Sequence, residues 1–302
     1  MGTPEFAIPS LTILIDNGYP ISAVITAPDK PRGRGQELSP TPIKRVALQH
    51  RLPVLQPGSL KEPRFVERVR DVKPDIIVVV AFRILPREVF TIPRLGSFNL
   101  HGSLLPKYRG AAPINWAIIN GEKETGVTTF LLQEKVDTGS VLLQARVPIV
   151  DDDDAGIIHD KLADVGAEIA LHTVRLLEQG KAVPKSQDEA LVSQAPKIFK
   201  DTCCIRWNQP AGNIRNLIRG LSPYPGAFTT HNGRVLKIYR TAVSNIASDS
   251  QPGTVLVNTT SLQVATRDSM LQVLELQQEG KRRMGVEEFV RGYKIRTGDI
   301  FG

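Results

Sequence analysis

Residues 75–81 read Asp-Ile-Ile-Val-Val-Val-Ala, in which Asp75 is followed by an unbroken apolar run built mainly from β-branched residues. Such a run is typical of a strand that is buried on both faces of a parallel sheet. Residues 96–100, Gly-Ser-Phe-Asn-Leu, predict the end of the next strand. Around these two lie strand patterns at 21–26, 127–132 and 141–147 and helix patterns at 42–50, 113–120 and 155–179. The first half of the chain therefore predicts an α/β fold with a doubly wound, Rossmann-like, mostly parallel sheet.

Three polar side chains stand at alternate positions where the second strand ends: Asn99, His101 and Ser103. Alternate residues of an extended strand share one face, and ligands of α/β sheets bind beyond the carboxyl ends of the strands. An amide can hold a developing oxyanion, and an imidazole can move protons or donate a hydrogen bond. This set predicts an acyl-transfer site where the strand gives way to a loop.

The composition limits the class of protein. With 302 residues, of which 41% are hydrophobic and 23% charged, the chain is long enough for two globular domains. It contains no apolar run near the roughly 20 residues that span a bilayer, and no signal-peptide pattern. The cysteines, Cys203 and Cys204, are adjacent and lack metal-ligand spacing, so we expect them to be small, partly buried strand residues in a reducing cytosol. We therefore expect a cytoplasmic protein that neither spans a membrane nor holds a metal ion.

A change of pattern divides the chain. Residues 181–200 are polar, contain two prolines and show no clear period, so we expect a linker between residues 1–180 and 201–302. Beyond it, short strand patterns at 202–207, 235–240, 253–257, 262–265 and 271–276 are separated by turn residues, with one helix pattern at 210–220. Such a pattern favours a small OB-like β-barrel, a fold that often holds nucleic acid.

The net charge of +7 is unevenly placed. Residues 200–302 hold 14 Lys and Arg against 8 Asp and Glu, a surplus of +6, whereas the rest of the chain is nearly neutral. A basic module beside a neutral one favours a polyanionic partner such as RNA or DNA. A solvated basic surface without a partner explains the same numbers, and charge alone leaves both explanations open.

Two further segments carry expectations. The acidic run at 151–154 has the look of a metal site, but it directly precedes a helix pattern, and we expect it to cap that helix. Residues 1–6 predict a loop entering a helix, with no strand before them. A doubly wound sheet normally begins with a strand, so either the start is truncated relative to the natural chain or the fold lacks its first strand.

Several motifs together resemble the methionyl-tRNA formyltransferases. They are Gly-Thr-Pro-Glu-Phe-Ala at 2–7, Pro-Asp-Lys-Pro-Arg-Gly-Arg-Gly at 28–35, Asn-Leu-His-Gly-Ser-Leu-Leu-Pro-Lys-Tyr-Arg-Gly at 99–110, Asp-Thr-Gly at 137–139 and Ser-Pro-Tyr-Pro-Gly-Ala at 222–227. The 99–106 motif marks the wider superfamily that uses 10-formyltetrahydrofolate. The arginine-rich loop at 28–35 and the motif at 222–227 narrow the resemblance from this superfamily to the methionyl-tRNA formyltransferases. One departure lies at 81–86, where Arg83 replaces a glycine that many members carry.

The resemblance implies transfer of a formyl group from 10-formyltetrahydrofolate to the α-amine of initiator methionyl-tRNA. Asn99 would donate to the formyl oxygen, and Asp137 would sit against His101 and fix the tautomer of its ring. His101 and Asp137 are both candidates to take the proton of the amine, and the sequence leaves open which one does so. No metal and no obligate protein partner are implied.

The resemblance also implies binding residues. The folate pocket would be formed by Phe82, Arg83, Ser103, Leu104, Leu105 and Pro106, in part through backbone groups. Contacts with tRNA would come from Arg32, Arg34, Lys281, Arg282 and Arg283. Lys107 and Arg109 are candidates to meet the glutamate tail of the folate or a tRNA phosphate.

Three alternatives are weighed against this interpretation. A formyltransferase acting on a sugar or nucleotide amine would not need the basic C-terminal barrel. A hydrolase releasing formate from the same folate would turn over without an amine acceptor. A catalytically silent RNA-binding homologue would not need the complete set of Asn99, His101 and Asp137.

Overall fold

The computed structural model describes residues 1–32, 37–244 and 246–302. The chain divides into two compact units. Unit 1 comprises Met1–Gly110, Thr125–Pro148 and His159–Ala195, and unit 2 comprises Ala111–Glu124, Ile149–Ile158 and Pro196–Gly302. Most of the expected linker, residues 181–195, therefore lies within unit 1.

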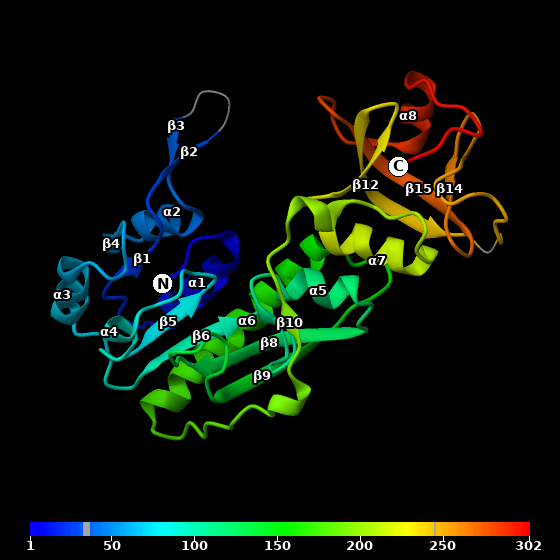
Figure 1. Ribbon diagram of the computed structural model, residues 1–302. Coiled ribbons are helices and arrows are strands. Elements are labelled where there is room, and N and C mark those ends of the chain that lie inside the picture. Colours follow the sequence, from blue (N-terminus) through cyan, green and yellow to red (C-terminus); the bar gives the residue numbers. More distant parts are fainter. Residues whose placement is uncertain (33–36, 245) are drawn as a thin grey trace. The chain divides into compact units, whose positions relative to one another are not determined.

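The secondary structure of unit 1 alternates helices and short strands (Figure 1). Its elements are η1 (Glu5–Ala7), α1 (Ile8–Asp16), β1 (Val24–Ile25), β2 (Lys30–Arg32), β3 (Glu37–Ser39), α2 (Pro42–Gln49), β4 (Val54–Leu55), α3 (Pro63–Val72), β5 (Ile77–Val80), α4 (Arg87–Phe90), β6 (Ser97–His101), β7 (Arg109–Gly110), β8 (Glu124–Leu131), β9 (Val141–Pro148), α6 (Ala155–Glu178), η2 (Glu189–Leu191) and β10 (Gln194–Ala195). Two of them, β8 and α6, begin in unit 2.

The main sheet of unit 1 has the order β5-β6-β8-β9, and β1 pairs with β4 in a separate parallel ribbon. Strand β5 runs parallel to β6, with Val79 opposite Asn99, whereas β8 runs antiparallel to β6, with Thr128 opposite His101. The predicted apolar run thus forms β5, and the Rossmann-like, mostly parallel sheet is confirmed. Strand β6 lies between two strands, which fixes the backbone that carries Asn99 and His101.

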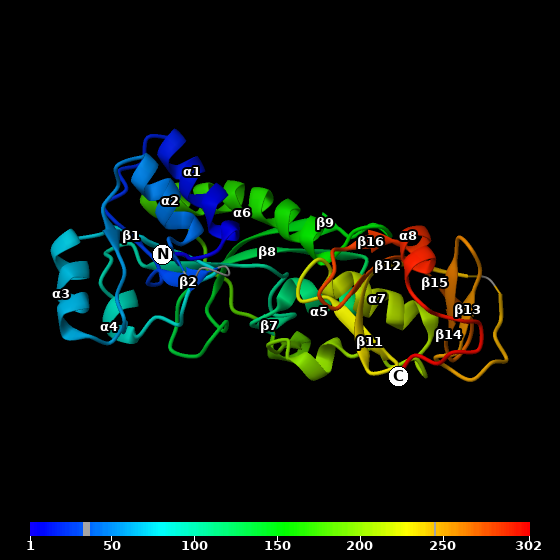
Figure 2. The same ribbon diagram turned by 90° about the horizontal axis from the view of Figure 1, so that it is seen from above.

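Helices cover both faces of this sheet, as a doubly wound fold requires. On one face Phe98 of β6 packs with Leu14 of α1 and Val174 of α6, and α1 and α6 lie on the same side in Figure 2. On the other face Val79 of β5 packs with Phe65 of α3 and with α4. Successive residues of β5 therefore feed opposite cores, which explains why this strand is apolar throughout.

Local signals in the sequence set the helix ends. Thr41 caps α2 by accepting a hydrogen bond from the Lys44 amide, and Pro42 follows in the first turn, where a missing N–H costs nothing. At the start of α6, Asp154 Oδ1 accepts from the Ile157 amide at 2.9 Å. The expectation that the acidic run caps a helix is therefore confirmed.

The N-terminus contributes one residue pair to the sheet instead of a strand. Gly2 forms an isolated parallel bridge with Val80, and its amide donates to the Ile25 carbonyl at 3.0 Å. The Met1 amine donates to the Val78 carbonyl at 2.6 Å. Residues 1 and 2 thus stand between β1 and β5.

Unit 2 is built on an antiparallel sheet (Figures 1 and 2). Its elements are α5 (Pro113–Ile119), η3 (Lys200–Cys203), α7 (Ala211–Leu221), β11 (Ala227–His231), β12 (Arg234–Val243), β13 (Val255–Val257), β14 (Leu262–Ala265), β15 (Met270–Gln278), β16 (Met284–Gly285) and α8 (Val286–Gly292). The strand order is β11-β12-β15-β14-β13, with β16 on β15. This curled antiparallel sheet confirms the barrel-like fold predicted for the last third.

The core of unit 2 encloses α7 and the inner face of this sheet. Ile218 of α7, Leu236 of β12 and Phe289 of α8 are almost completely buried in it. One prediction here was wrong: residues 202–207 do not form a strand. Lys200–Cys203 is a 3₁₀ helix, and only Cys204 bridges to Phe228. Because Asp201 and Thr202 are polar residues that favour turns, local preference overcomes the β-branched and sulfur-containing residues that follow.

Candidate active site

Strand β6 places two of the predicted residues on one face at its carboxyl end. Asn99 and His101 are two positions apart in the strand, so both side chains leave the same side. The side-chain oxygen of Asn99 is buried and has no hydrogen-bond partner among the described residues. A buried polar atom without a partner is uncommon, and a ligand that uses this amide would remove the penalty.

His101 is held in one tautomer. The ring is 6% exposed, and its Nε2 lies 2.8 Å from the Tyr108 carbonyl oxygen. A carbonyl oxygen only accepts, so Nε2 carries a proton and donates it. Nδ1 is therefore the nitrogen with a free lone pair in the neutral ring. The main chain of Tyr108, rather than Asp137 as the resemblance implied, sets this tautomer.

Asp137 faces the open nitrogen of that ring. Its Oδ2 lies 3.9 Å from His101 Nδ1, which is longer than a hydrogen bond but close enough to stabilise a protonated ring. The same oxygen accepts a hydrogen bond from the Gly110 amide at 2.9 Å. Both Asp137 and His101 are less than 10% exposed. The pair can thus receive a proton at Nδ1 and stabilise the resulting imidazolium with a fixed carboxylate.

The loop that carries Asp137 is in an unusual conformation. Asp137 has φ of 56°, in the left-handed region that non-glycine residues rarely adopt. A Cβ on Gly139 would lie 1.6 Å from the Leu131 carbonyl oxygen, so only glycine fits there. Such a backbone persists only where its surroundings hold it.

Gln187 supplies that hold. Its Nε2 donates to the carbonyl oxygens of Asp137, at 2.9 Å, and Gly139, at 2.8 Å. Its Oε1 accepts from Nε and Nη2 of Arg109, at 3.1 and 2.8 Å. Arg109 also contacts the exposed carboxylate of Glu189. Gln187 therefore joins the Asp137 loop to the strand that follows Tyr108, and we name this group the Gln187 clamp.

The clamp accounts for the side chain of Arg109 and adds one residue to the site. Arg109 is 5% exposed, and its guanidinium is hydrogen-bonded to Gln187 and Glu189. A contact of Arg109 with a folate tail or a phosphate stays a prediction. Gln187 does not stand out in the sequence, because residues 181–200 show no periodicity and lack an adjacent motif. The one available signal was the hydrogen-bonding capacity of a polar segment that sequence alone does not bring near Asp137.

The loop after β6 is held by its own polar groups. Ser103 is fully buried, and its hydroxyl donates to the Lys107 carbonyl at 2.6 Å. Thr128 of β8 donates to the Ser103 carbonyl, and the Leu105 amide donates to Thr128. In this structure Ser103 thus shapes the segment that includes Leu104, Leu105 and Pro106.

Phe82 and Arg83 lie just beyond β5. The Arg83 guanidinium lies 5.3 Å from the centre of the Phe82 ring and donates to the carbonyls of Pro57 and Gly58, at 2.9 and 3.0 Å. Arg83 therefore ties its loop to residues 57–58, which is a structural use of the side chain that stands where many relatives have glycine.

The predicted tRNA-binding residues are only partly described. Arg34 lies outside the described residues, and Arg32 ends β2 with its side chain outside them. Lys281 and Arg282 are exposed in unit 2, and Arg282 pairs with Glu288. Arg283 pairs with Glu275 and stacks over Tyr239 at 4.4 Å, so it is more engaged than a free phosphate-binding side chain.

The described residues show neither a cluster of metal ligands nor a membrane-spanning helix. They contain no group of three or more His, Cys, Asp or Glu side chains placed to hold a metal ion. Within the same residues no helix is both long and apolar enough to cross a membrane.

Comparison with known proteins defines the class. Residues 1–174 match the family described as formyl transferase, and residues 197–294 match the formyl transferase C-terminal domain, so the protein is a formyltransferase. The chain is 49% identical to the methionyl-tRNA formyltransferase of Caldanaerobacter subterraneus subsp. tengcongensis, over 99% of this chain and 98% of that one. It is 47% identical to that of Syntrophus aciditrophicus, over 100% and 97%. The chain belongs to the methionyl-tRNA formyltransferase family.

Solved structures share the fold at low identity. An N-formyltransferase from Helicobacter canadensis, in complex with folinic acid and dTDP-3-aminofucose, matches with a TM-score of 0.70 and 20% identity, covering 92% of this chain and 97% of that one. HypX from Aquifex aeolicus, in complex with tetrahydrofolic acid, matches with a TM-score of 0.60 and 19% identity, covering 83% and 47%.

Proposed function

We propose that this chain transfers the formyl group of 10-formyltetrahydrofolate to the α-amine of initiator methionyl-tRNA in the cytoplasm. Family membership supports the reaction, and the two folate-bound structures of the same fold support the donor. The observation that carries the proposal is the buried, unpartnered side-chain oxygen of Asn99 on the same strand face as His101, whose Nδ1 is the ring nitrogen open to a proton. We assign catalysis to residues 1–180, with Gln187 of the 181–200 segment, and tRNA binding to residues 201–302.

Asn99 stabilises charge in this mechanism. When the amine attacks the formyl carbon, an N–C bond forms and negative charge develops on the formyl oxygen. The Asn99 NH₂ donates to that oxygen, and its buried carbonyl oxygen is left to accept an N–H of the attacking amine. One donor of this kind typically contributes roughly 10²–10³ in rate. The buried site strengthens the interaction because competing water is absent.

His101 moves the proton. A free α-amine has a pKa of about 7.7–8.0, so it must lose a proton near pH 7 before or during attack. Nδ1 takes a proton from the amine, since Nε2 is committed to the Tyr108 carbonyl. Asp137 stabilises the imidazolium from 3.9 Å. When the bond from the formyl carbon to N10 breaks, the same proton goes to N10 and the ring returns to its neutral form.

Folate would be held beside this pair by the backbone and apolar groups of residues 103–106 and by the loop at Phe82 and Arg83. The tRNA would be held by Arg32 and Arg34 and by Lys281, Arg282 and Arg283 of unit 2. Arginine grips phosphate through two parallel hydrogen bonds and also stacks on exposed bases.

The test is formyl transfer from 10-formyltetrahydrofolate to methionyl-tRNA by the full chain, with His101→Ala and uncharged tRNA as controls. We expect transfer that requires the charged tRNA and collapses in the variant. Transfer to a sugar or nucleotide amine, or formate release without any acceptor, would replace the proposal by one of the alternatives above. Binding of tRNA without transfer would identify a silent homologue.

A further inference from the structure

The short strands β7 and β10 form a two-stranded parallel ribbon within unit 1. Arg109 lies opposite Gln194, and Gly110 lies opposite Ala195. A Cβ on Gly110 would lie 2.5 Å from the Ala195 carbonyl oxygen, so the two backbones approach as closely as glycine permits. The pairing therefore fixes the main chain of β7 against the segment 193–195.

The main chain at β7 reaches both side chains of the acid–base pair. The Tyr108 carbonyl, directly before β7, accepts from His101 Nε2 at 2.8 Å. The Gly110 amide, within β7, donates to Asp137 Oδ2 at 2.9 Å. Main-chain groups of neighbouring residues thus orient the imidazole and the carboxylate together. Whatever holds this stretch of backbone also holds the acid–base pair.

Ser193 holds the peptide unit that carries the Tyr108 carbonyl. The Ser193 carbonyl accepts from the Arg109 amide at 2.9 Å. The Arg109 N–H and the Tyr108 C=O belong to one planar peptide unit and point in opposite directions. That unit is therefore fixed between the Ser193 carbonyl on one side and the His101 ring on the other.

The hydroxyl of Ser193 makes a second link, to a residue in an uncommon conformation. Tyr108 has φ of 60°, in the left-handed region that non-glycine residues rarely adopt. Such a conformation persists only where neighbouring groups hold it. Ser193 Oγ accepts from the Tyr108 amide at 2.9 Å, so Ser193 binds the N–H on each side of this conformation. The hydroxyl link depends on the side chain at 193, and a substitution there removes it while the main-chain link is retained.

We propose that Ser193 is a positioning residue for His101. Its hydroxyl fixes Tyr108 in the conformation that directs the carbonyl oxygen to Nε2, which leaves Nδ1 as the ring nitrogen that takes the proton of the amine. Ser193 acts through the main chain of Tyr108 and takes no part in bond formation itself. The inference rests on the proposed function, because that function assigns the proton transfer to His101.

The experiment compares Ser193→Ala, which removes the hydroxyl, with Ser193→Thr, which retains one. We expect Ser193→Ala to lower kcat for formyl transfer roughly 10-fold, since small misplacements of a reacting group are costly. Ser193→Thr should keep kcat within about threefold of the wild type. The KM for the folate should stay within about twofold in both variants, because the two links go to Tyr108 and Arg109 and not to residues 103–106.

Ser97→Ala is the matched control. It removes a hydroxyl that donates to the Phe90 carbonyl at 2.7 Å, at the start of β6, and should leave kcat within about twofold. Equal kcat values for Ser193→Ala and Ser97→Ala would overturn the proposal. Equal losses in Ser193→Ala and Ser193→Thr would also overturn it, because the hydroxyl would then have no part in the effect.

A second measurement needs no substrate. Nitrogen NMR of the full chain, at a pH where the ring is neutral, reports which ring nitrogen of His101 carries the proton, and His101→Gln identifies the signal. We expect the Nε2–H form in the wild type and in Ser193→Thr, and a mixture of both forms in Ser193→Ala. The Nε2–H form alone in Ser193→Ala would overturn the proposal. A wild type that transfers no formyl group would instead contradict the proposed function.

Discussion

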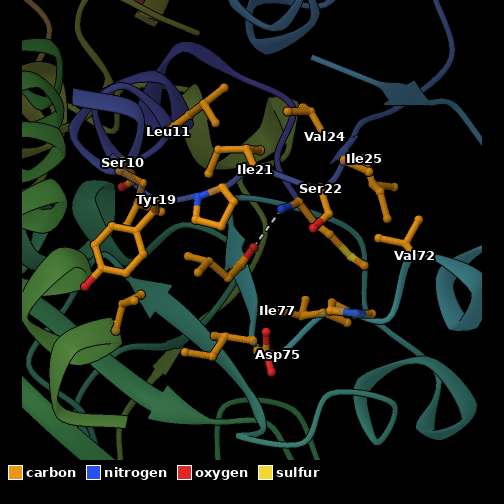
Figure 3. A pocket seen from close by; sticks show the side chains of 18 of the residues that line it. Ser10, Leu11, Tyr19, Ile21, Ser22, Val24, Ile25, Val72, Asp75 and Ile77 are labelled. Carbon is orange, nitrogen blue, oxygen red and sulfur yellow. Dashed lines mark hydrogen bonds between the residues drawn. The ribbon is translucent and has the colours of Figure 1, made fainter. Parts of the chain in front are cut away.

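The two ends of the β5–β6 region differ sharply. At the carboxyl end of β6, every group around His101 is fixed: Tyr108 sets the ring, Gly110 holds the Asp137 carboxylate, and Gln187 holds the Asp137 main chain. On the other edge of β5, the sheet opens into an apolar cavity of about 360 Å³, which lies between β5 and the ribbon of β1 and β4 (Figure 3). The difference teaches that polar links from Tyr108, Gly110 and Gln187 hold the site in addition to the pairing of β6 with its two neighbouring strands.

The largest expected effect comes from a substitution at the carboxyl end of β6, where His101 lies. His101→Gln keeps a donor for the Tyr108 carbonyl but has no group that takes the proton of the amine, so formyl transfer should decrease roughly 10²- to 10⁴-fold. Initial rates of formyl-methionyl-tRNA formation measure this. His172→Gln, on an exposed face of α6, is the matched control and should keep full activity. More than about a tenth of the activity in His101→Gln would exclude His101 as the acceptor.

The second prediction concerns the Met1 amine, at the other edge of β5. Burial lowers the pKa of the Met1 amine from 8.0 to about 5. Between these values the unfolded chain binds a proton that the folded chain does not, so stability should decrease as the pH falls from 8 to 5. The expected slope is about 1.4 kcal/mol per pH unit.

Urea unfolding at several pH values measures that slope. The N-terminally acetylated chain is the control, because it has no amine to titrate. Between pH 8 and 5 the slope of its unfolding free energy against pH should be smaller by about 1.4 kcal/mol per pH unit. Identical slopes for the two forms would mean that the amine is solvated rather than buried.

These contrasts show what the sequence can predict. The alternation of Asn99, His101 and Ser103 correctly placed Asn99 and His101 on one face at the end of β6, because a period of two is a property of the strand itself. Asp137 is different: it entered through the resemblance, because nothing in a lone Asp-Thr-Gly states which strand end it approaches.

Gln187 and the 202–207 segment mark the limit of this reasoning. Gln187 acts through hydrogen bonds to main-chain carbonyls about 50 positions away, an interaction that leaves no local pattern. In the 202–207 segment, strand preference competed with turn-forming residues at its start, and single-sequence patterns do not measure which is stronger. Both failures concern contacts distant in sequence or a balance of small energies.

The third prediction sharpens the role of the clamp. Gln187→Glu retains an acceptor for Arg109 but removes the donor to the carbonyls of Asp137 and Gly139. The Asp137 loop should relax, and kcat should decrease roughly 10- to 100-fold, since small misplacements of a reacting group are costly. The KM for the folate should change little, because Gln187 contacts neither residues 103–106 nor the Phe82 loop.

Steady-state kinetics with both substrates separate these two parameters. Glu189→Gln is the matched control: it alters the other partner of Arg109, lies 67% exposed, and should leave kcat within about twofold. Equal effects of the two variants would show that Arg109, and not the donor of Gln187, positions the loop.

The smallest expected effect lies in unit 2. Arg282→Ala removes an exposed pair with Glu288, so the free energy of unfolding should change by no more than about 0.5 kcal/mol. If Arg282 binds a tRNA phosphate, the slope of log K against log salt concentration should decrease by about one. Filter binding over a salt series measures this slope. Arg291→Ala, which removes a basic side chain from α8, is compared in the same series. Parallel salt slopes for the wild type and Arg282→Ala would remove Arg282 from the tRNA interface.

The Tyr108 carbonyl has a consequence for how this enzyme can diverge. Because the main-chain oxygen of Tyr108 orients the imidazole of His101, this hydrogen bond does not depend on which side chain stands at position 108. The requirement there is conformational: φ is 60°, a region closed to β-branched residues. Lineages can therefore exchange the side chain at this position within the limits of packing, while the direction in which the ring hands over its proton is inherited unchanged.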